Sequence, residues 1–170
     1  MIGPGEQLFA FEANPTMLAG QIAASLKLHR ANVALTHGSN GEYGHPAHVL
    51  MHAMTRVAVE TYGEGAPLFY TFAAAYPGHP YPRLTNPDDP AHLIVDVSAY
   101  LEQKEAAALC HRTQNPLFVR RRSEQAGRQL TVREALLTVE GLRRQWPPVT
   151  SALDDTFAKL MLGLGAAEVS

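Results

Sequence analysis

A short apolar run at Asn32–Thr36 leads directly into a glycine-rich loop and then into a helical segment at Pro46–Thr61. The run has the length and composition of a buried strand, and the helical segment has a proline in its first turn and Gly63 past its end. Four further segments continue this alternation of strand and helix: Thr16–Leu28, Leu68–Phe72, His92–Val95 and Ser98–His111. Such alternation predicts an α/β fold, a Rossmann-like layered sheet with flanking helices, whose sites lie in the loops that follow strands.

The remaining segments are assigned from local signals. Leu8–Phe11 is predicted as a short strand, and the proline-rich stretch Pro77–Pro90 as a loop. Thr131–Glu134 forms a capping box, which predicts a helix that continues to Trp146. Apolar residues at helical spacing in Ser151–Leu164 predict a last helix that packs into the core. We expect a single domain over residues 1–170, with residues 146–170 as its C-terminal helical part.

Charge and cysteine content argue against several classes of protein. With 14 Lys and Arg against 16 Asp and Glu, the net charge of −2 argues against a general nucleic-acid binder. The single cysteine, Cys110, excludes an internal disulfide framework, and we expect it to be a buried helix residue. The sequence shows no signal-peptide pattern, and its longest uncharged stretch, residues 65–82, is interrupted by prolines. These features predict a cytoplasmic protein without a membrane span.

All eight histidines lie between His29 and His111. Three of them, His45, His48 and His52, fall within about 60° of one another on one face of the predicted helix. The core face of that helix is predicted from its apolar residues: Leu50, Ala53, Met54 and Val57. The histidines should therefore flank the core, where they serve either as metal ligands or as ordinary capping and surface residues.

A metal site needs more than this helix provides. Catalytic zinc takes three protein ligands and a water, commonly with a carboxylate among the ligands. Glu42, in the loop before the helix, is the best internal carboxylate to complete such a site, although solvated loop glutamates are common.

Two stretches resemble the LmbE-like or PIG-L deacetylases, which are zinc-dependent enzymes that act mostly on N-acetylglucosamine conjugates. The first stretch, with Thr36-His37 and then Gly41-Glu42-Tyr43-Gly44-His45-Pro46-Ala47-His48, is similar to the second signature of that family. The second stretch looks like the family's helix that ends in a His-x-Ser-Gln-type motif: Asp96–Leu101, Lys104, Ala108, His111, Thr113 and Gln114. The resemblance covers about residues 15–145 and corresponds to the C-terminal part of the family domain.

The resemblance implies a role for three residues of the loop. His48 would bind zinc, and His45 would stabilise the tetrahedral oxyanion or donate a proton during amide hydrolysis. Tyr43 would line the entrance and help to polarise the carbonyl. Zinc would activate the attacking water, and a carboxylate would act as its general base. The substrate would be a small amino-sugar conjugate.

The sequence departs from the family at two places. Ala47 stands where the family often has an aspartate that orients the preceding histidine. The family's first signature, a strand followed by His-Pro-Asp-Asp, has no counterpart here, although it supplies two zinc ligands and the general base. We therefore expect a truncated chain that lacks the N-terminal strands and is a poor catalyst alone. Asn86–Pro90 is similar to that signature with Asn in place of His, but its setting among prolines predicts a turn.

A second hypothesis is a non-catalytic relic of the fold, or a binding module that forms a homo-oligomer. The stripe of the last predicted helix would then pair with another subunit through its apolar residues: Leu153, Phe157, Leu160 and Leu164.

Overall fold

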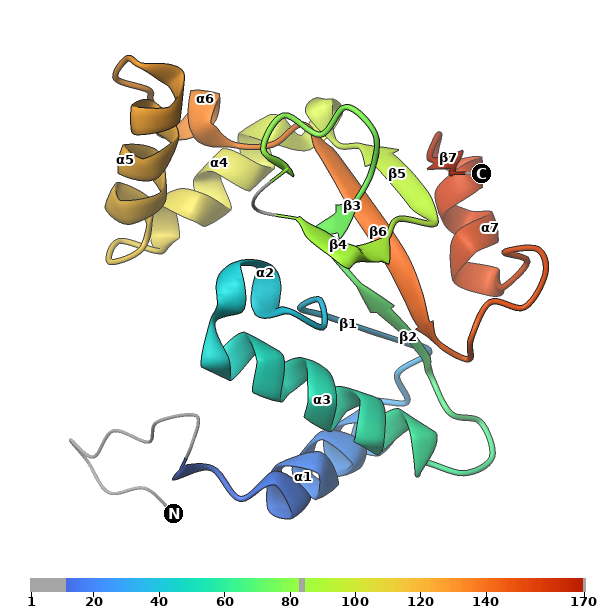
Figure 1. Cartoon of the computed structure of the whole chain (residues 1–170). Helices are drawn as coiled ribbons and strands as arrows, with labels where there is room; N and C mark the ends of the chain where they lie inside the picture. The colour runs from blue at the N-terminus through green and yellow to red at the C-terminus, as the bar shows by residue number, and fades with distance from the viewer. Residues whose placement is uncertain (1–11, 83–84, 170) are drawn as a thin grey trace. The chain divides into compact units, whose positions relative to one another are not determined.

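The computed structural model describes residues 12–82 and 85–169, and the predicted strand Leu8–Phe11 lies outside them (Figure 1). The chain forms two compact units. Among the described residues, the larger unit comprises those up to Ile94 together with Gly141 onward, and the smaller unit comprises Val95–Glu140.

The larger unit is built around a five-stranded mixed sheet. Its strands run in the order β1 (Val33–Thr36), β2 (Leu68–Thr71), β6 (Val139–Trp146), β5 (Leu93–Asp96) and β7 (Ala167–Glu168). β1 and β2 are parallel, whereas β6 is antiparallel to β2 and β7 is antiparallel to β5. This sheet with flanking helices confirms the predicted α/β class.

Two helices, α1 (Pro15–Leu28) and α3 (Pro46–Glu60), lie side by side, and α3 also contacts β1 and β2 (Figure 1). A buried cluster of Ala34, Val59 and Phe69 joins α3 to the two strands. Parallel β1 and β2 thus connect through α3, as the alternation of segments predicted.

The predicted core face of α3 is wrong. Its buried residues are His52, Thr55, Ala58 and Val59, whereas Val57 is exposed. Met54 and Val57 instead line an apolar groove shared with α1. The reason is that α3 contacts both the sheet and α1, so its apolar residues divide between the two: Val59 packs against the strands, whereas Met54 and Val57 face the groove with α1.

The predicted helix up to Trp146 is also wrong beyond its first turn. The capping box at Thr131 is present, but α6 ends at Ala135 and β6 follows it. β6 contains a buried arginine, Arg144, that is paired with Asp155. A buried charge within a strand hides the alternation of apolar and polar residues by which strands are recognised.

A small parallel pair, β3 (Ala74–Ala75) and β4 (Asn86–Pro90), replaces part of the predicted proline-rich loop. Asn86 and Asp89 in β4 are buried, with 1% and 5% of their surface exposed. The prolines predicted a loop, but the pairing of β4 uses the backbone N–H groups of Asn86 and Ala91, which donate to Ala73 and Ala75. Pro87 and Pro90, which lack an N–H, are therefore compatible with the strand.

The last predicted helix is shorter than expected. α7 (Thr156–Gly163) begins after its N-cap Asp155. Of the predicted apolar stripe, Leu153 is buried, but Leu160 and Leu164 are 57% and 70% exposed. The stripe does not pack into the core as a whole, because only its first turn reaches the sheet side, where Phe157 contacts Tyr70.

The smaller unit is helical. It contains a 3-10 turn, Ser98–Tyr100, followed by α4 (Leu101–Cys110), α5 (Asn115–Ala126) and α6 (Val132–Ala135). Val119, Leu130 and Ala135 form its buried cluster. Cys110 is exposed at the end of α4, so its predicted burial is wrong. Within the described residues, no helix is long and apolar enough to cross a membrane.

Candidate metal centre

The histidine loop begins where β1 ends. His37 directly follows Thr36, and α2 (Gly41–Gly44) leads from the loop into α3. Because the carboxyl ends of parallel strands are where α/β proteins bind ligands, the loop lies where the sequence predicted a site.

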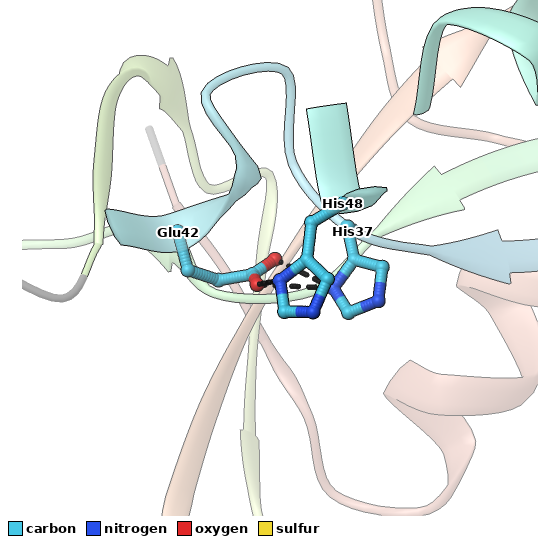
Figure 2. Close-up of side chains that lie close together, drawn as sticks. All are labelled: His37, Glu42 and His48. Carbon is cyan, nitrogen blue, oxygen red and sulfur yellow. Dashed lines mark hydrogen bonds and ion pairs between the residues drawn. The ribbon is translucent and has the colours of Figure 1, made fainter. Parts of the chain in front are cut away.

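Three side chains of this loop come together: His37, Glu42 and His48. The Nδ1 atom of His37 lies 2.9 Å from Oε1 and 3.0 Å from Oε2 of Glu42. The Nδ1 atom of His48 lies 2.6 Å from Oε2 of the same carboxylate. Figure 2 shows the carboxylate beside both imidazole rings, which are stacked with centroids 3.7 Å apart and planes inclined by 5°.

This trio has the chemistry of a metal site. Each residue offers a ligand atom of the kind that zinc binds, and these atoms lie within 4.8 Å of one another. All three residues are half-buried, which favours an ion over a fully solvated cluster of charges. The three residues are thus of the kinds that zinc binds, and they lie close enough together to be a candidate metal site.

Glu42 reaches this position through an unusual backbone conformation. Its φ of 59° and ψ of −59° belong to a strained region that non-glycine residues rarely occupy. The preceding Gly41 has φ 64°, and a Cβ there would lie 2.9 Å from Cγ2 of Val49 and 3.1 Å from its backbone nitrogen. Glycine is therefore required at Gly41 both for its conformation and for the close approach of α3.

The residues with predicted roles lie side by side. His45 is the N-cap of α3, and its ring centroid is 4.4 Å from that of His48. The Tyr43 ring lies 5.9 Å from His45 and 5.7 Å from His48. Tyr43 and His45 are exposed, whereas His48 is half-buried behind them. This places two exposed polar groups next to the trio of His37, Glu42 and His48.

His52 does not belong with these histidines. It is 6% exposed, and its Nδ1 atom lies 3.0 Å from the backbone carbonyl of His37. The prediction that all three histidines flank the core is therefore wrong for His52, which is buried and contacts Phe69. His52 lies one helical turn further along α3 than His48, at a position where α3 packs against Phe69 of β2.

A buried polar network braces the loop from β4. The Asp89 carboxylate accepts hydrogen bonds from the Ser39 backbone at 2.9 Å and from the Asn86 amide at 2.8 Å. Asn86 also donates to the Ser39 hydroxyl at 2.7 Å. Burial would raise the pKa of Asp89, but hydrogen bonds from Ser39 and Gln145 outweigh it and hold that pKa below its ordinary value. Asn86 and Asp89 of β4 thus hold the histidine loop in place through Ser39.

Sequence reasoning identified Glu42 as the carboxylate of the site but assigned no role to His37. The available signal was its position, the first residue after a predicted strand; that strand was expected to be buried, but in β1 only Ala34 is buried and Leu35 is exposed. What the sequence did not show is that one carboxylate contacts both His37 and His48.

Comparison with known proteins adds the chemical context. No family model matches the chain. It is 31% identical over 122 residues to the 1D-myo-inositol 2-acetamido-2-deoxy-alpha-D-glucopyranoside deacetylase of Thermomonospora curvata. It is 32% identical over 123 residues to the enzyme of that name from a Mycobacterium species, and 36% identical over 112 residues to the one from Saccharomonospora viridis. The chain is similar to amino-sugar deacetylases.

The alignments with these deacetylases cover only part of this chain and less than half of each relative. The alignments cover 55–61% of this chain and 40–42% of the length of the three relatives. Among solved structures, GalB, the 4-carboxy-2-hydroxymuconate hydratase from Pseudomonas putida KT2440, overlaps with a TM-score of 0.47 at 24% identity. That overlap covers 89% of this chain and 65% of GalB.

Proposed function

We propose that this chain carries the metal-binding loop of a zinc-dependent hydrolase of the LmbE-like or PIG-L family. It would remove the N-acetyl group from an N-acetylglucosamine-type conjugate. The observation that carries the proposal is the trio His37, Glu42 and His48 at the end of β1, with His45 and Tyr43 exposed beside it. The similarity to deacetylases of N-acetylated amino sugars supports the substrate class.

His48 is the proposed zinc ligand. Bound zinc polarises a carbonyl oxygen and supplies a nucleophilic water at neutral pH, which is the chemistry that amide hydrolysis needs. His48 is suited to this role because it lies between the Glu42 carboxylate on one side and the exposed rings of His45 and Tyr43 on the other.

His45 and Tyr43 are proposed to contact the acetamide. His45 can donate a hydrogen bond to the oxygen that becomes negative in the tetrahedral intermediate, or deliver a proton to the departing amine. The Tyr43 hydroxyl can donate to the acetyl carbonyl at the entrance. Their exposure is consistent with contact to a substrate that arrives from solvent.

The general base remains unassigned in this proposal. The resemblance gives that role to a carboxylate of the His-Pro-Asp-Asp signature, which has no counterpart in this sequence. Ala47 also leaves His45 without the neighbouring aspartate that the family often has, and no carboxylate within the described ranges hydrogen-bonds to the His45 ring. We therefore expect slow acetate release from this chain alone.

Zinc binding is the decisive measurement. Titration of the wild-type chain with zinc, followed by calorimetry, is expected to show one site that His48→Ala abolishes. His45→Ala should leave zinc affinity unchanged, because His45 faces substrate in this proposal. His29→Ala, an exposed histidine at the end of α1, is the matched control. Equal zinc content in wild type and His48→Ala would refute the assignment.

A second candidate is a binding module that forms oligomers. The observation in its favour is exposed apolar surface on a helix that the sheet covers incompletely, at Leu160 and Leu164. Leu35 of β1, the first strand in the order of the sheet, is also 53% exposed. Size-exclusion chromatography with light scattering separates the two candidates. A defined oligomer without zinc affinity would favour the module, whereas zinc binding by His48 favours the hydrolase.

A further inference from the structure

We propose that Glu42 is a positioning residue that holds His37 and His48 through their Nδ1 atoms and leaves Nε2 of His48 to bind the metal. Glu42 would then lie behind the ligand and would not itself bind the ion. This inference rests on the proposed function, because it concerns the same metal.

The proposal assigns the proton of each ring to Nδ1, the nitrogen that lies next to the Glu42 carboxylate. An ionised carboxylate only accepts hydrogen bonds, so each Nδ1 that faces Glu42 must be an N–H donor. Both His37 and His48 face it through Nδ1, at 2.9 Å and 2.6 Å. A neutral imidazole with its proton on Nδ1 has its lone pair on Nε2, which is therefore the nitrogen available to a metal.

The same arrangement recurs in metal proteins as a carboxylate behind a histidine ligand. Such a carboxylate fixes the tautomer and the ring orientation of the ligand and raises its basicity. Its loss typically lowers metal affinity 10–100-fold without removing a ligand. Glu42 matches this role for His48, since its carboxylate reaches only the Nδ1 side of the ring.

Ring stacking excludes the two histidines as joint ligands in the observed geometry. The lone pair of an imidazole nitrogen lies in the ring plane, and the planes of His37 and His48 are inclined by only 5°, with centroids 3.7 Å apart. An ion at a Zn–N distance of about 2.0–2.1 Å from each ring cannot lie in both planes. At most one histidine of the pair can therefore be a ligand in this geometry.

His48 is the better ligand of the pair because of what surrounds each ring. His37 packs edge-on against Phe72, with centroids 5.0 Å apart. His48 instead contacts the rings of Tyr43 and His45, which are exposed to solvent. An ion held by His48 would thus lie on the side from which a substrate approaches.

The strained backbone of Glu42 is an independent indication. A non-glycine residue at φ 59°, ψ −59° persists only where the surroundings over-determine it, and such residues gather at functional sites. Here the carboxylate also accepts a hydrogen bond from the Gly38 backbone at 3.3 Å. The turn is therefore built to present this carboxylate to the two rings.

Long-range proton–nitrogen NMR of the imidazoles tests the inference directly. In the metal-free wild type, with the rings neutral, His37 and His48 are expected in the Nδ1–H form. In Glu42→Gln both should shift toward the Nε2–H form that free imidazole favours, and zinc affinity should fall 10–100-fold. Glu42→Asp keeps a carboxylate and should retain the Nδ1–H form. Glu60→Gln, an exposed glutamate of α3 paired with Arg56, is the control and should change neither quantity.

Zinc added to the wild type should shift Nε2 of His48 and leave its Nδ1–H in place. Unchanged tautomers in Glu42→Gln, or zinc on a Nδ1 atom, would overturn the role of Glu42. The absence of any zinc-induced shift would instead overturn the metal role of His48 and the proposed function with it. The tautomers of the metal-free chain test Glu42 independently of that result.

Discussion

The residues of the histidine loop differ in burial and in hydrogen bonding. Glu42 and His48 are half-buried and hydrogen-bonded to each other, whereas Tyr43 and His45 are exposed. A group that must hold one geometry gains from burial and a charged partner, and a group that must reach a substrate gains from exposure. The two glycines around Glu42, Gly41 and Gly44, allow this alternation within four residues.

Those glycines provide a matched pair of variants. Gly41→Ala and Gly44→Ala both place a side chain at positive φ, 64° and 81°, which costs about 1–2 kcal/mol. Only at Gly41 would the new Cβ meet α3, 2.9 Å from Val49 Cγ2, so about 1–3 kcal/mol more is expected there. Urea denaturation measures both losses of unfolding free energy.

The two glycine variants are also expected to differ in zinc affinity. Gly41→Ala displaces the backbone next to His48 and should weaken zinc binding, while Gly44→Ala, whose Cβ meets nothing within 4 Å, should bind nearly as the wild type does. Equal effects on zinc affinity would show that the close contact with α3 does not position the ligand.

At the level of elements, β4 supports the histidine loop through Asp89. This carboxylate is an acceptor for Ser39 of the loop and Asn86 of β4, and Arg143 of β6 lies 3.6 Å from it. A buried acceptor that serves several donors is costly to remove, because each donor then loses its partner. β4 thus anchors the histidine loop through these buried hydrogen bonds.

Asp89→Ala is expected to lower the free energy of unfolding by about 1–3 kcal/mol, the cost of leaving a buried donor unsatisfied. Asp88→Ala, at the exposed neighbouring position, should change it by less than about 0.5 kcal/mol. Thermal or urea denaturation of both variants at neutral pH gives the comparison. Similar stabilities for the two variants would contradict a bracing role.

Lowering the pH should remove the stabilisation that the Asp89 carboxylate provides. The pKa of Asp89 is lower in the folded chain than its ordinary value, so its stabilisation is fully present above that ordinary value, about 3.9. It is lost as the pH falls through the folded-state pKa. Between pH 5 and pH 3 the wild type should lose more stability than Asp89→Ala does, since the variant has no carboxylate to protonate.

At the level of the whole molecule, distant segments of the larger unit meet at Asp155. This N-cap of α7 bonds to Arg144 of β6 at 2.8 Å and accepts a hydrogen bond from the Tyr70 hydroxyl of β2 at 2.6 Å. The side chains of Arg144 and Asp155 are 7% and 9% exposed. Burial, with the Asp155 charge, raises the pKa of Tyr70, which stays a neutral donor. These contacts connect the end of the chain to the strands beside the site.

Asp155→Ala should be the most damaging single substitution at this junction. It leaves Arg144 buried without its counter-charge, and breaking such a pair costs about 3–5 kcal/mol. Asp154→Ala, at the exposed position before it, is the control and should cost less than about 0.5 kcal/mol. Urea denaturation followed by circular dichroism measures both, and a loss under about 1 kcal/mol for Asp155→Ala would show that the pair is dispensable.

Features that depend on neighbours along the chain could be predicted from the sequence. β1, α3 and β2 lie close to their predicted limits because apolar runs, a proline at N1 and a glycine stop are local signals. The capping box at Thr131 is present for the same reason. The candidate trio lies directly after β1, where loops that follow parallel strands in an α/β sheet commonly bind ligands.

Features that depend on contacts between residues far apart in the sequence became visible only in the folded structure. β6 is a strand although it carries Arg144, because that charge is neutralised by Asp155 and faces Tyr70 of another strand. α3 buries His52 because two neighbours, α1 and the sheet, compete for its faces. Glu42 contacts two histidines only because a strained turn directs it there. Local pattern cannot encode these outcomes, since each is set by the contacts of the folded chain.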